Sequence, residues 1–404
     1  MTKDKEKLGF WTFVFLWFGA AVSIAEIMTG GLIAPLGFKI GLVVILLGHL
    51  IGTGILILGG IIGTREKVPA MTSTNISFGR YSTYLFSILN ILQLIGWTAI
   101  MLKVAANSIN LISQNLWGFN NVLVFIIFIG ILTILWLCFG NSGMKKLNIT
   151  AVSLLFILTL ILGSIIFKDK TLLLKAGTGG ISFGSALELS IVMPLSWLPL
   201  IADYTRFAKS EKGGAYGSFI GYFFGSSWMF IIGLGAAIVS KNSDPSVMML
   251  AANLGIAALG IVVLSTVTTT FLDVYSAGVS FLNIIPKYSD KKIGIIMTII
   301  GTLVAIIIPM ENYESFLYAI GSVFAPLFAI LITDYFIIKK NIKTQSNILV
   351  NWGAIIIWII GILLYYWFLK HDLVFGATVP DMVITGFIYL ISWRMMSKWK
   401  LTTK

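Results

Sequence analysis

Twelve apolar stretches, each about as long as a bilayer-spanning helix, follow one another along this chain of 404 residues. A spanning helix needs roughly 20 predominantly apolar residues, because hydrocarbon offers the backbone no hydrogen-bond partners. The composition agrees, since 58% of the residues are hydrophobic, 11% are charged and the mean hydropathy is +0.97, values atypical of soluble domains. We therefore predict an all-α polytopic membrane protein. The predicted spans lie near residues 10–34, 40–63, 83–112, 120–139, 147–167, 186–208, 216–240, 254–285, 293–310, 315–338, 349–369 and 381–397.

The basic residues are concentrated in every second segment that connects these spans. If the amino terminus is cytoplasmic, most of the 28 Lys and Arg residues fall in segments on that same side, for example at 65–80, 206–212 and 339–343. Cytoplasmic segments of membrane proteins carry such an excess of positive charge. We expect a bacterial-type cytoplasmic membrane with both termini cytoplasmic. The net charge of +12 then belongs to the loops and indicates no nucleic-acid partner.

The longest external segment, Lys168–Ser185, follows the fifth span. Because five is an odd number, the next five spans enter the membrane in the opposite orientation. This is the topology of the inverted repeats found in secondary transporters. It predicts a first repeat in residues 1–170, a second repeat in residues 186–340, and two accessory spans in residues 345–404.

The first and sixth spans, which correspond in such a repeat, both contain features that interrupt a helix. Residues 186–208 include Pro194 and Pro199, and proline removes a backbone donor, which leaves carbonyl groups unpaired near the middle of the span. The first span contains small residues, a glycine pair and the carboxylate of Glu26. Transporters build substrate sites at such breaks. The alternatives are an ordinary proline kink, and tight helix packing with Glu26 in a structural ion pair.

Five ionisable side chains fall within the predicted spans. They are Glu26, Lys103, Asp203, Asp273 and Asp334. Such residues are functional candidates, because hydrocarbon does not solvate charge. Asp203 has the spacing for a local ion pair with Arg206. Lys103 either extends to the interface or neutralises a buried carboxylate, and Asp334 lies close enough to an inner helix end to reach the interface.

Aromatic and amide side chains in two spans suggest a binding site for a flat ligand. Gln93 and Trp97 are four residues apart and project from one helix face, while Ser196 and Trp197 lie in the interrupted sixth span. Indoles stack on planar rings, and an amide hydrogen-bonds a polar ring edge. The alternative is that each tryptophan only packs against its neighbours.

The eighth span crowds hydroxyl groups next to an acidic residue. It contains Ser265, Thr266, Thr268, Thr269 and Thr270, followed by Asp273. Hydroxyl oxygens and freed carbonyl oxygens are ligands suited to Na⁺. The alternative is that the hydroxyls bond to carbonyl groups of their own helix.

The residue sets of membrane enzymes are not found in this sequence. His49 and His371 are far apart, Cys138 is the single cysteine, and no catalytic triad motif or phosphate-binding loop is present. A passive channel would favour repeated pore-lining rings of one residue type, whereas the candidates here form one asymmetric set. We therefore expect a transporter without a cofactor, and neither an enzyme nor a channel.

The combined motifs resemble those of the nucleobase:cation symporter family one, most closely its cytosine-permease and hydroxymethylpyrimidine-transporter branch. The similar stretches are WFGAAVSIAEIMTGG in span one, QLIGW in span three, SWLPLIADYTRFAK in span six, and TTT followed by DVYSAG in span eight. The similarity extends over essentially the whole chain in length and span order. It implies a leucine-transporter-type core of ten helices in a 5+5 inverted repeat, two accessory helices, and alternating access coupled to Na⁺ or H⁺.

The resemblance also assigns roles to individual residues. The matching positions are Trp97, Gln93, Ser196 and Trp197 for the substrate ring, Asp273 for its polar edge, and Ala25, Met28, Thr268 and Thr269 for a Na⁺ ion. This chain departs from the family at Met101, where some relatives have a glutamine, and at Glu26.

A carboxylate at Glu26 or Asp273 suits an aminopyrimidine, whose exocyclic amine donates hydrogen bonds. The expected substrate is therefore a hydroxymethyl-aminopyrimidine of the thiamine-precursor type, with cytosine second. An amino-acid or other small-solute symporter on the same fold is the alternative, and such a protein would not need two indoles.

Overall fold

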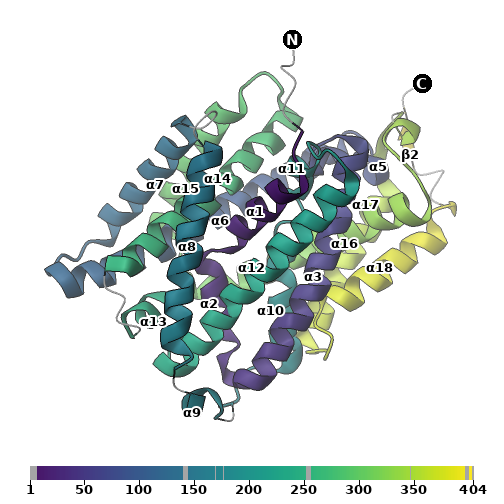
Figure 1. Ribbon diagram of the computed structural model, residues 1–404. Coiled ribbons are helices and arrows are strands. Elements are labelled where there is room, and N and C mark those ends of the chain that lie inside the picture. Colours follow the sequence, from purple (N-terminus) through teal and green to yellow (C-terminus); the bar gives the residue numbers. More distant parts are fainter. Residues whose placement is uncertain are drawn as a thin grey trace.

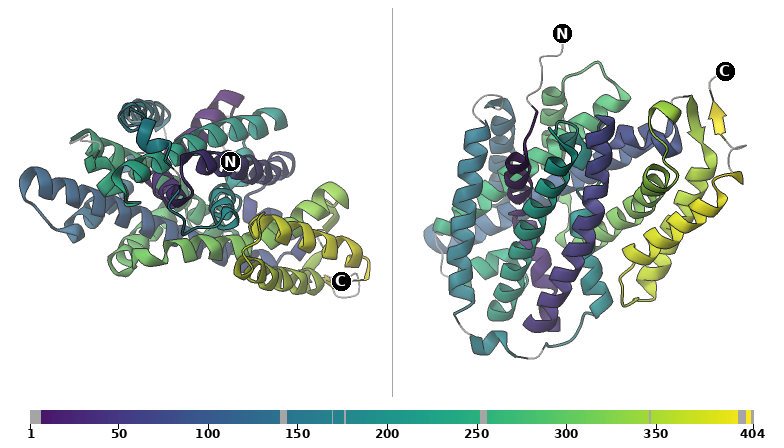
Figure 2. Two further views of the ribbon diagram at one scale, coloured as in Figure 1. Left: turned by 90° about the horizontal axis from the view of Figure 1, so that it is seen from below. Right: turned by 45° about the vertical axis from the view of Figure 1, so that its right-hand side comes forward.

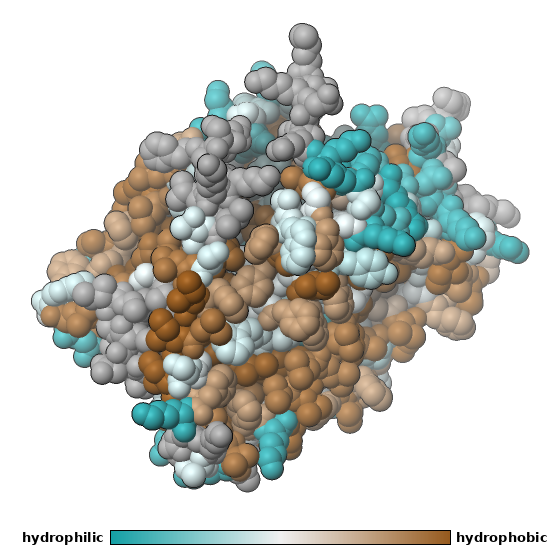
Figure 3. Space-filling model, viewed as in Figure 1, coloured by the Kyte–Doolittle hydropathy of each residue, from teal (hydrophilic) through white to brown (hydrophobic). Residues whose placement is uncertain are grey.

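The computed structural model of the protein describes residues 7–139, 144–168, 170–175, 177–251, 256–345, 347–395 and 400–402. These residues form a bundle of long helices (Figure 1). Six single helices of the described part are long and apolar enough to cross a membrane, and the bent pair formed by residues 10–36 makes a seventh. Apolar residues cover most of the middle of the face seen in Figure 3, as expected for a surface that contacts lipid.

Helices occupy every one of the twelve predicted positions. They are α1 (Phe10–Ala21) with α2 (Ile24–Leu32), α3 (Phe38–Glu66), α6 (Ser82–Trp117), α7 (Val122–Phe139), α8 (Met144–Ile166), α10 (Phe183–Leu195) with α11 (Ile201–Thr205), α12 (Glu211–Ser240), α14 (Ile256–Ile284), α15 (Asp290–Ile307), α16 (Tyr313–Ile332), α17 (Trp352–Lys370) and α18 (Thr378–Ser392). The connecting elements are η1 (Ala34–Leu36), α4 (Ala70–Ser73), α5 (Asn75–Phe78), α9 (Lys170–Leu173), α13 (Pro245–Ala251), η2 (Met310–Asn312), η3 (Thr333–Ile337), η4 (Lys343–Gln345), and the antiparallel strands β1 (Ile348–Asn351) and β2 (Lys400–Thr402).

The prediction for the eleventh span is wrong at its start. Residues 349–351 belong to β1, and the helix begins at Trp352. Asn351 is the reason, because its side chain accepts a hydrogen bond from the backbone N–H of Ala354 and so caps the helix. Hydropathy alone does not detect such a cap.

The helix contacts repeat with an offset of five spans. α1 packs along α12 and, correspondingly, α10 packs along α3; α6 contacts α15 and, correspondingly, α14 contacts α7. This reciprocity is what an inverted repeat of five helices produces, while the residue boundaries of the two repeats stay a prediction. The accessory helices α17 and α18 pack on α16 at one side of the bundle (Figure 2).

The first and sixth spans, which occupy corresponding positions in the inverted repeat, are both broken, as predicted. The axis of residues 10–21 makes an angle of 59° with that of residues 24–36, and the break lies at Val22 and Ser23. The sixth span is helical to Leu195, continues as turns over residues 196–200, and resumes as α11. The two breaks place non-helical backbone inside the bundle.

The basic connecting segments gather at one end of the bundle, and both ends of the chain lie at this end too (Figure 1). The N–H of Leu8 donates to the carbonyl of Phe207 at 2.8 Å, and the N–H of Arg80 donates to the carbonyl of Ile348 at 3.0 Å. β2, near the carboxyl end, pairs with β1 at this same end. A chain with an even number of spans must have both termini on the same side of the membrane, as is found here.

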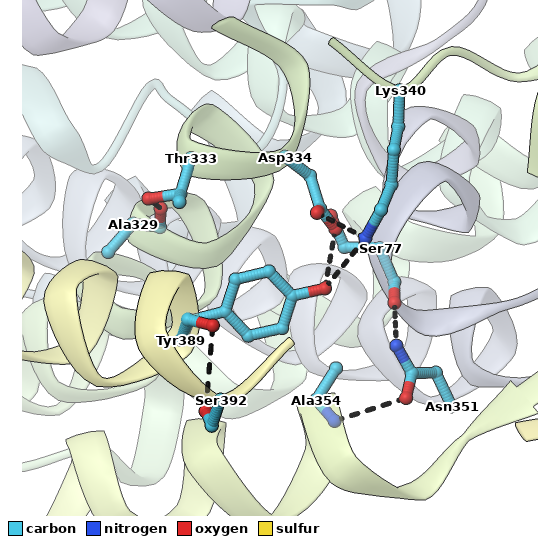
Figure 4. A network of polar contacts seen from close by, with 9 residues as sticks. All are labelled: Ser77, Ala329, Thr333, Asp334, Lys340, Asn351, Ala354, Tyr389 and Ser392. Carbon is cyan, nitrogen blue, oxygen red and sulfur yellow. Dashed lines mark hydrogen bonds and ion pairs between the residues drawn. The ribbon is translucent and has the colours of Figure 1, made fainter. Parts of the chain in front are cut away.

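Asp334 does not reach the interface. It is fully buried in η3, a π-helical turn at the end of α16, where Lys340 donates to Oδ1 and the Tyr389 hydroxyl donates to Oδ2 at 2.7 Å (Figure 4). The hydrogen bond from Tyr389 joins this end of α16 to the accessory helix α18. A buried carboxylate needs such partners, because water cannot solvate it.

The predicted Asp203–Arg206 ion pair is not formed. The ion pairs within the described ranges are Arg65–Glu211 and Lys340–Asp334. Oδ1 of Asp203 instead accepts from the N–H of Ala70 at 3.0 Å, and Nε of Arg206 donates to the backbone carbonyl of Asp203. The Asp203 carboxylate is buried and therefore bonds the nearest interior donor, while the partly exposed guanidinium lies over the ring of Phe207.

Lys103 extends toward a helix end and does not neutralise a carboxylate within the described residues. Its Nζ lies 3.5 Å from the carbonyl of Ile306 in the last turn of α15. The carboxyl-terminal turn of a helix carries partial negative charge and attracts cations. The structure therefore favours a Lys103 side chain that extends toward the interface over one that neutralises a buried carboxylate.

Candidate functional site

The two broken spans border one small cavity at the centre of the bundle. Seven of the predicted site residues line this cavity, together with Ser23, Met101 and Met193. The seven are Ala25, Glu26, Trp97, Ser196, Trp197, Thr269 and Asp273. Only about 10 Å³ is open to the centre of a water-sized sphere, roughly enough for one water molecule. Side chains must therefore move before the cavity can hold a ring.

The break in the first span is held by hydroxyl groups. The Ser23 side chain accepts from the N–H of Glu26 at 3.4 Å and caps α2, while the N–H of Ile24 donates to the Ser265 hydroxyl of α14 at 3.0 Å. Both contacts satisfy donors that the first turn of a helix leaves unpaired. The start of α2 is thereby tied to the eighth span.

The break in the sixth span is held by two amides of α6. Nε2 of Gln93 donates to the carbonyl of Ser196 at 3.1 Å, and Nδ2 of Asn90 donates to the carbonyl of Pro199 at 3.2 Å. These are carbonyl groups that the interrupted helix leaves without an internal partner. Gln93 does not line the cavity and positions the broken segment beside it. The Ser196 hydroxyl donates to the carbonyl of Met193.

The two indoles border the cavity from different spans. Trp97 packs edge-on against Phe316, with ring centroids 5.4 Å apart, and against Tyr313 at 6.2 Å. Trp197 packs edge-on against Trp17 at 5.7 Å. Such contacts fix the ring orientations. A planar ligand that entered the cavity would contact both indoles.

Asp273 is the acidic residue of the cavity whose side chain has no protein partner. It is 3% exposed, and within the described residues no hydrogen bond to its carboxyl oxygens is found. A buried polar group without a partner is unfavourable and indicates that a ligand or water supplies the missing hydrogen bonds. Asp273 is therefore available to a substrate.

Glu26 also lines the cavity, but both of its oxygens are already bonded. Oε1 accepts from the Tyr222 hydroxyl at 2.8 Å, and Oε2 lies 2.6 Å from the Ser226 hydroxyl oxygen. Both partners belong to α12, which packs closely on α2: a Cβ at Gly30 would lie 2.2 Å from the carbonyl oxygen of Phe230. The lack of a side chain at this glycine lets the helices approach closely enough for Glu26 to reach α12.

The four residues expected to hold Na⁺ are only partly brought together. Ala25 and Thr269 line the cavity, and the Thr269 hydroxyl has no partner within the described residues. The Thr268 hydroxyl donates to the carbonyl of Leu264 in its own helix at 2.7 Å. This agrees with the alternative that hydroxyls of the eighth span bond to their own helix instead of to a cation. Met28 does not line this cavity and borders a larger one.

Two larger cavities lie at the end of the bundle opposite the termini. Their volumes are 650 and 310 Å³, and they share Leu32, Asn242, Ser243 and Glu314. We call the two together the vestibule. Tyr313 lines the vestibule, bonds the Thr29 hydroxyl of α2 at 2.7 Å, and packs against Trp97. The contact between Tyr313 and Trp97 thus separates the vestibule from the central cavity.

Sequence reasoning missed several residues that surround the site. Tyr222 and Ser226 on α12 bond Glu26, and His49 on α3 bonds Ser226. Asn90 is three residues from Gln93, and this spacing on one helix face was the available signal. In the sequence, His49 stands out only as one of two widely separated histidines. Pairings across 177 to 200 residues leave no local pattern in the sequence.

Glu188 was also missed and has a structural role. The hydroxyls of Tyr365 and Thr378 and the N–H groups of Ala377 and Thr378 donate to its two oxygens at 2.6–2.9 Å. These contacts join α10 to the accessory helices. These four hydrogen bonds use the acceptor positions of both carboxyl oxygens.

Comparison with known proteins identifies a family whose profile covers nearly the whole chain. Residues 1–393 match the profile of a family described as "Permease for cytosine/purines, uracil, thiamine, allantoin". The cytosine permease of Escherichia coli strain K12 is 30% identical over 190 residues, which are 46% of this chain and 45% of that protein. The matched part is therefore less than half the length of that relative.

Solved structures share the fold. Mhp1, a nucleobase-cation-symport-1 family transporter in a closed conformation with bromovinylhydantoin bound, superposes with a TM-score of 0.80 at 17% identity, covering 99% of this chain and 95% of that one. A Na⁺-coupled sialic acid symporter in an outward-open state gives a TM-score of 0.67 at 16% identity, covering 95% and 89%. The predicted leucine-transporter-type fold is confirmed.

Proposed function

Because the chain belongs to the nucleobase:cation symporter family one, whose members are permeases and not enzymes, we propose that it imports a small planar pyrimidine by cation-coupled alternating access. The preferred substrate is a hydroxymethyl-aminopyrimidine of the thiamine-precursor type, and cytosine is second. The protein is then a multi-pass protein of a bacterial-type cytoplasmic membrane, and both of its termini are cytoplasmic. The vestibule then faces the outside.

The observation that carries this proposal is the unpartnered carboxyl of Asp273 between two indoles. Trp97, Trp197 and Asp273 line the same cavity, and Asp273 is buried without a hydrogen-bond partner in the described part of the chain. An aminopyrimidine offers a flat ring to the indoles and an exocyclic amine to the carboxyl group. A leucine side chain offers neither.

The route of the substrate follows from the cavities. The substrate ring enters the vestibule and passes into the central cavity when Tyr313 moves away from Trp97. There it lies between the breaks of the first and sixth spans. Because α2 and the segment 196–200 carry the cavity lining, rearrangement of the broken spans opens the site to the other side. The present conformation, with almost no free volume, is an occluded state on this route.

The coupling cation is proposed to bind beside the substrate. Oxygens of Ala25, Met28, Thr268 and Thr269 are the Na⁺ ligands that the resemblance implies, and the unpartnered Thr269 hydroxyl supports this assignment. Met28 and Thr268 would have to rearrange, since Thr268 bonds its own helix here. Na⁺ binding then holds α2 against α14 and organises the cavity for the substrate.

The proposal is tested by intrinsic tryptophan fluorescence of the purified protein, titrated with hydroxymethyl-aminopyrimidine, cytosine, uracil and leucine, each with and without Na⁺. We expect saturable quenching by an aminopyrimidine, with a lower Kd when Na⁺ is present because two ligands that favour one state raise each other's affinity. Saturable binding of leucine with no response to any pyrimidine would instead make the protein an amino-acid symporter.

A further inference from the structure

Two methionines line the central cavity, and the proposed function gives them no role. Met101 follows Trp97 on α6 by four residues, so the two share a helix face. Met193 lies in the last turn of α10, four residues before Trp197. Later residues of α6 line the vestibule, and so do residues just before α10. Both thioethers therefore lie on the vestibule side of the indoles.

The buried side chains of Met101 and Met193 form an apolar part of the lining, which we call the thioether wall. A thioether has no hydrogen to donate and is only a weak acceptor. It does make favourable contacts with aromatic rings and with other apolar groups. A ring edge that meets the thioether wall therefore gains packing contacts and no strong hydrogen bond.

The polar side chains of the lining offer a substrate few hydrogen-bond donors. Both oxygens of Glu26 are bonded to α12, and the Ser196 hydroxyl donates to the carbonyl of Met193. Asp273 has a free carboxyl group, which as a carboxylate only accepts. Within the described residues, no side chain of the lining carries an amide, ammonium, guanidinium or imidazole group. The donors that remain among its side chains are two hydroxyls and two indole N–H groups.

These remaining donors belong to other parts of the cavity than the thioether wall. The hydroxyls of Ser23 and Thr269 come from the first and eighth spans, whereas the wall comes from the third and sixth. The N–H of an indole lies in the plane of its ring, so an indole that stacks on a substrate does not direct its N–H at the substrate edge. The amide of Gln93 does not line the cavity, and its Nε2 donates to Asn90 and to the carbonyl of Ser196.

We propose that the thioether wall selects aminopyrimidines that carry an apolar group at the ring edge next to it, and rejects those that carry a ring carbonyl group there. While the exocyclic amine donates to Asp273, a carbonyl oxygen at the wall would lose its water and gain no hydrogen bond, which is unfavourable. A methyl group at the same place gains apolar contacts. The inference rests on the proposed function and narrows its substrate class to aminopyrimidines without a ring carbonyl group.

The small volume of the cavity strengthens this selection. Only about 10 Å³ is open in the present conformation, so the lining must expand by the volume of the ring that enters. A lining that expands only to fit the ring leaves no space for a water molecule that would bridge a carbonyl oxygen to a more distant donor. Rejection by an unpaired buried polar group is one of the ways in which binding sites discriminate between similar ligands.

The selection is tested on the purified wild-type protein by equilibrium binding of two ligands that differ at ring position 2. There 4-amino-2-methylpyrimidine carries a methyl group and cytosine carries a carbonyl oxygen, while both keep the exocyclic amine. We expect the Kd for cytosine to exceed the Kd for the methyl compound by about 5- to 150-fold, the effect of one buried carbonyl group without a hydrogen bond. A Kd for cytosine that is equal or lower overturns the inference.

The variant Met101→Gln tests whether the thioether wall causes the selection. Glutamine is unbranched like methionine, but it ends in an amide that donates to a carbonyl oxygen. We expect the ratio of the two Kd values to fall at least about fivefold in Met101→Gln. In the matched control Met101→Leu, which keeps the wall apolar at similar volume, the ratio should stay close to that of the wild type. An unchanged ratio in Met101→Gln overturns the assignment to the wall. If Met101→Gln does not fold, Met193→Gln and Met193→Leu take the place of this pair.

The results separate this inference from the proposed function. If both ligands bind the wild type and the methyl compound is not preferred, the thioether wall does not select between them, and the proposed function stands. If neither these ligands nor any other pyrimidine binds, the proposed function is contradicted and the inference falls with it.

Discussion

Asp273→Ala is expected to weaken cytosine binding by about 5- to 150-fold, because it leaves the buried exocyclic amine of cytosine without a hydrogen-bond partner, which costs roughly 1–3 kcal/mol. The substitution removes the cavity's unpartnered carboxyl group. The measurement is equilibrium binding of radiolabelled cytosine to the purified protein. Asp273→Asn, which keeps one acceptor oxygen in place, should retain more affinity than Asp273→Ala.

Uracil is the matched control for this prediction. It has the same pyrimidine ring but presents a carbonyl oxygen where cytosine has its exocyclic amine, so it lacks the amine hydrogen bond to Asp273 and keeps only its ring N–H groups as donors. Its affinity should fall less than that of cytosine in Asp273→Ala, and the preference of the wild type for cytosine over uracil should shrink. An unchanged cytosine affinity in Asp273→Ala would show that the carboxyl group does not contact the ring edge.

Trp97→Ala is expected to raise the Kd for cytosine by about 5- to 150-fold, since stacking of an aromatic side chain on a base contributes roughly 1–3 kcal/mol. Trp97 lines the cavity and also packs against Tyr313, which separates the cavity from the vestibule. Trp97→Phe keeps an aromatic face and should recover part of the affinity. Radiolabelled ligand binding is the appropriate measurement, because the substitution also removes a fluorophore.

Trp11→Ala provides the matched control for Trp97→Ala. Trp11 lies near the start of α1 and is 68% exposed, away from the cavity lining, so its removal should leave the Kd for cytosine unchanged. Equal losses in the two variants would point to general destabilisation of the protein. Full affinity in Trp97→Ala would contradict the stacked site.

The spans and their breaks could be predicted because their causes are local. An apolar run of sufficient length must form a helix in hydrocarbon, and this fixes the twelve positions. Proline is disfavoured inside a helix, so Pro194 and Pro199 predicted the interruption, which covers residues 196–200 directly after the helix that contains Pro194. Likewise, residue type and helical spacing pointed to Trp97 and Trp197, the resemblance added Asp273, and the structure places all three around one cavity.

The polar partners could not be predicted because they come from distant parts of the chain. Glu26 and Ser226 are 200 residues apart, and Asp334 meets Tyr389 across 55 residues. The local spacing of Asp203 and Arg206 suggested an ion pair, but a tertiary donor, the N–H of Ala70, took its place. Local spacing indicates which side chains can meet and does not show which partners are closer in the fold.

The central claim, cation-driven pyrimidine import, is tested most directly by uptake into proteoliposomes that contain the purified protein. Labelled hydroxymethyl-aminopyrimidine or cytosine is supplied outside, with an inward Na⁺ gradient, an inward proton gradient, both gradients, or neither. We predict accumulation above the external concentration when a cation gradient is imposed, and simple equilibration without one. Uptake that stops at the external concentration under every gradient would contradict the claim and indicate a passive pathway.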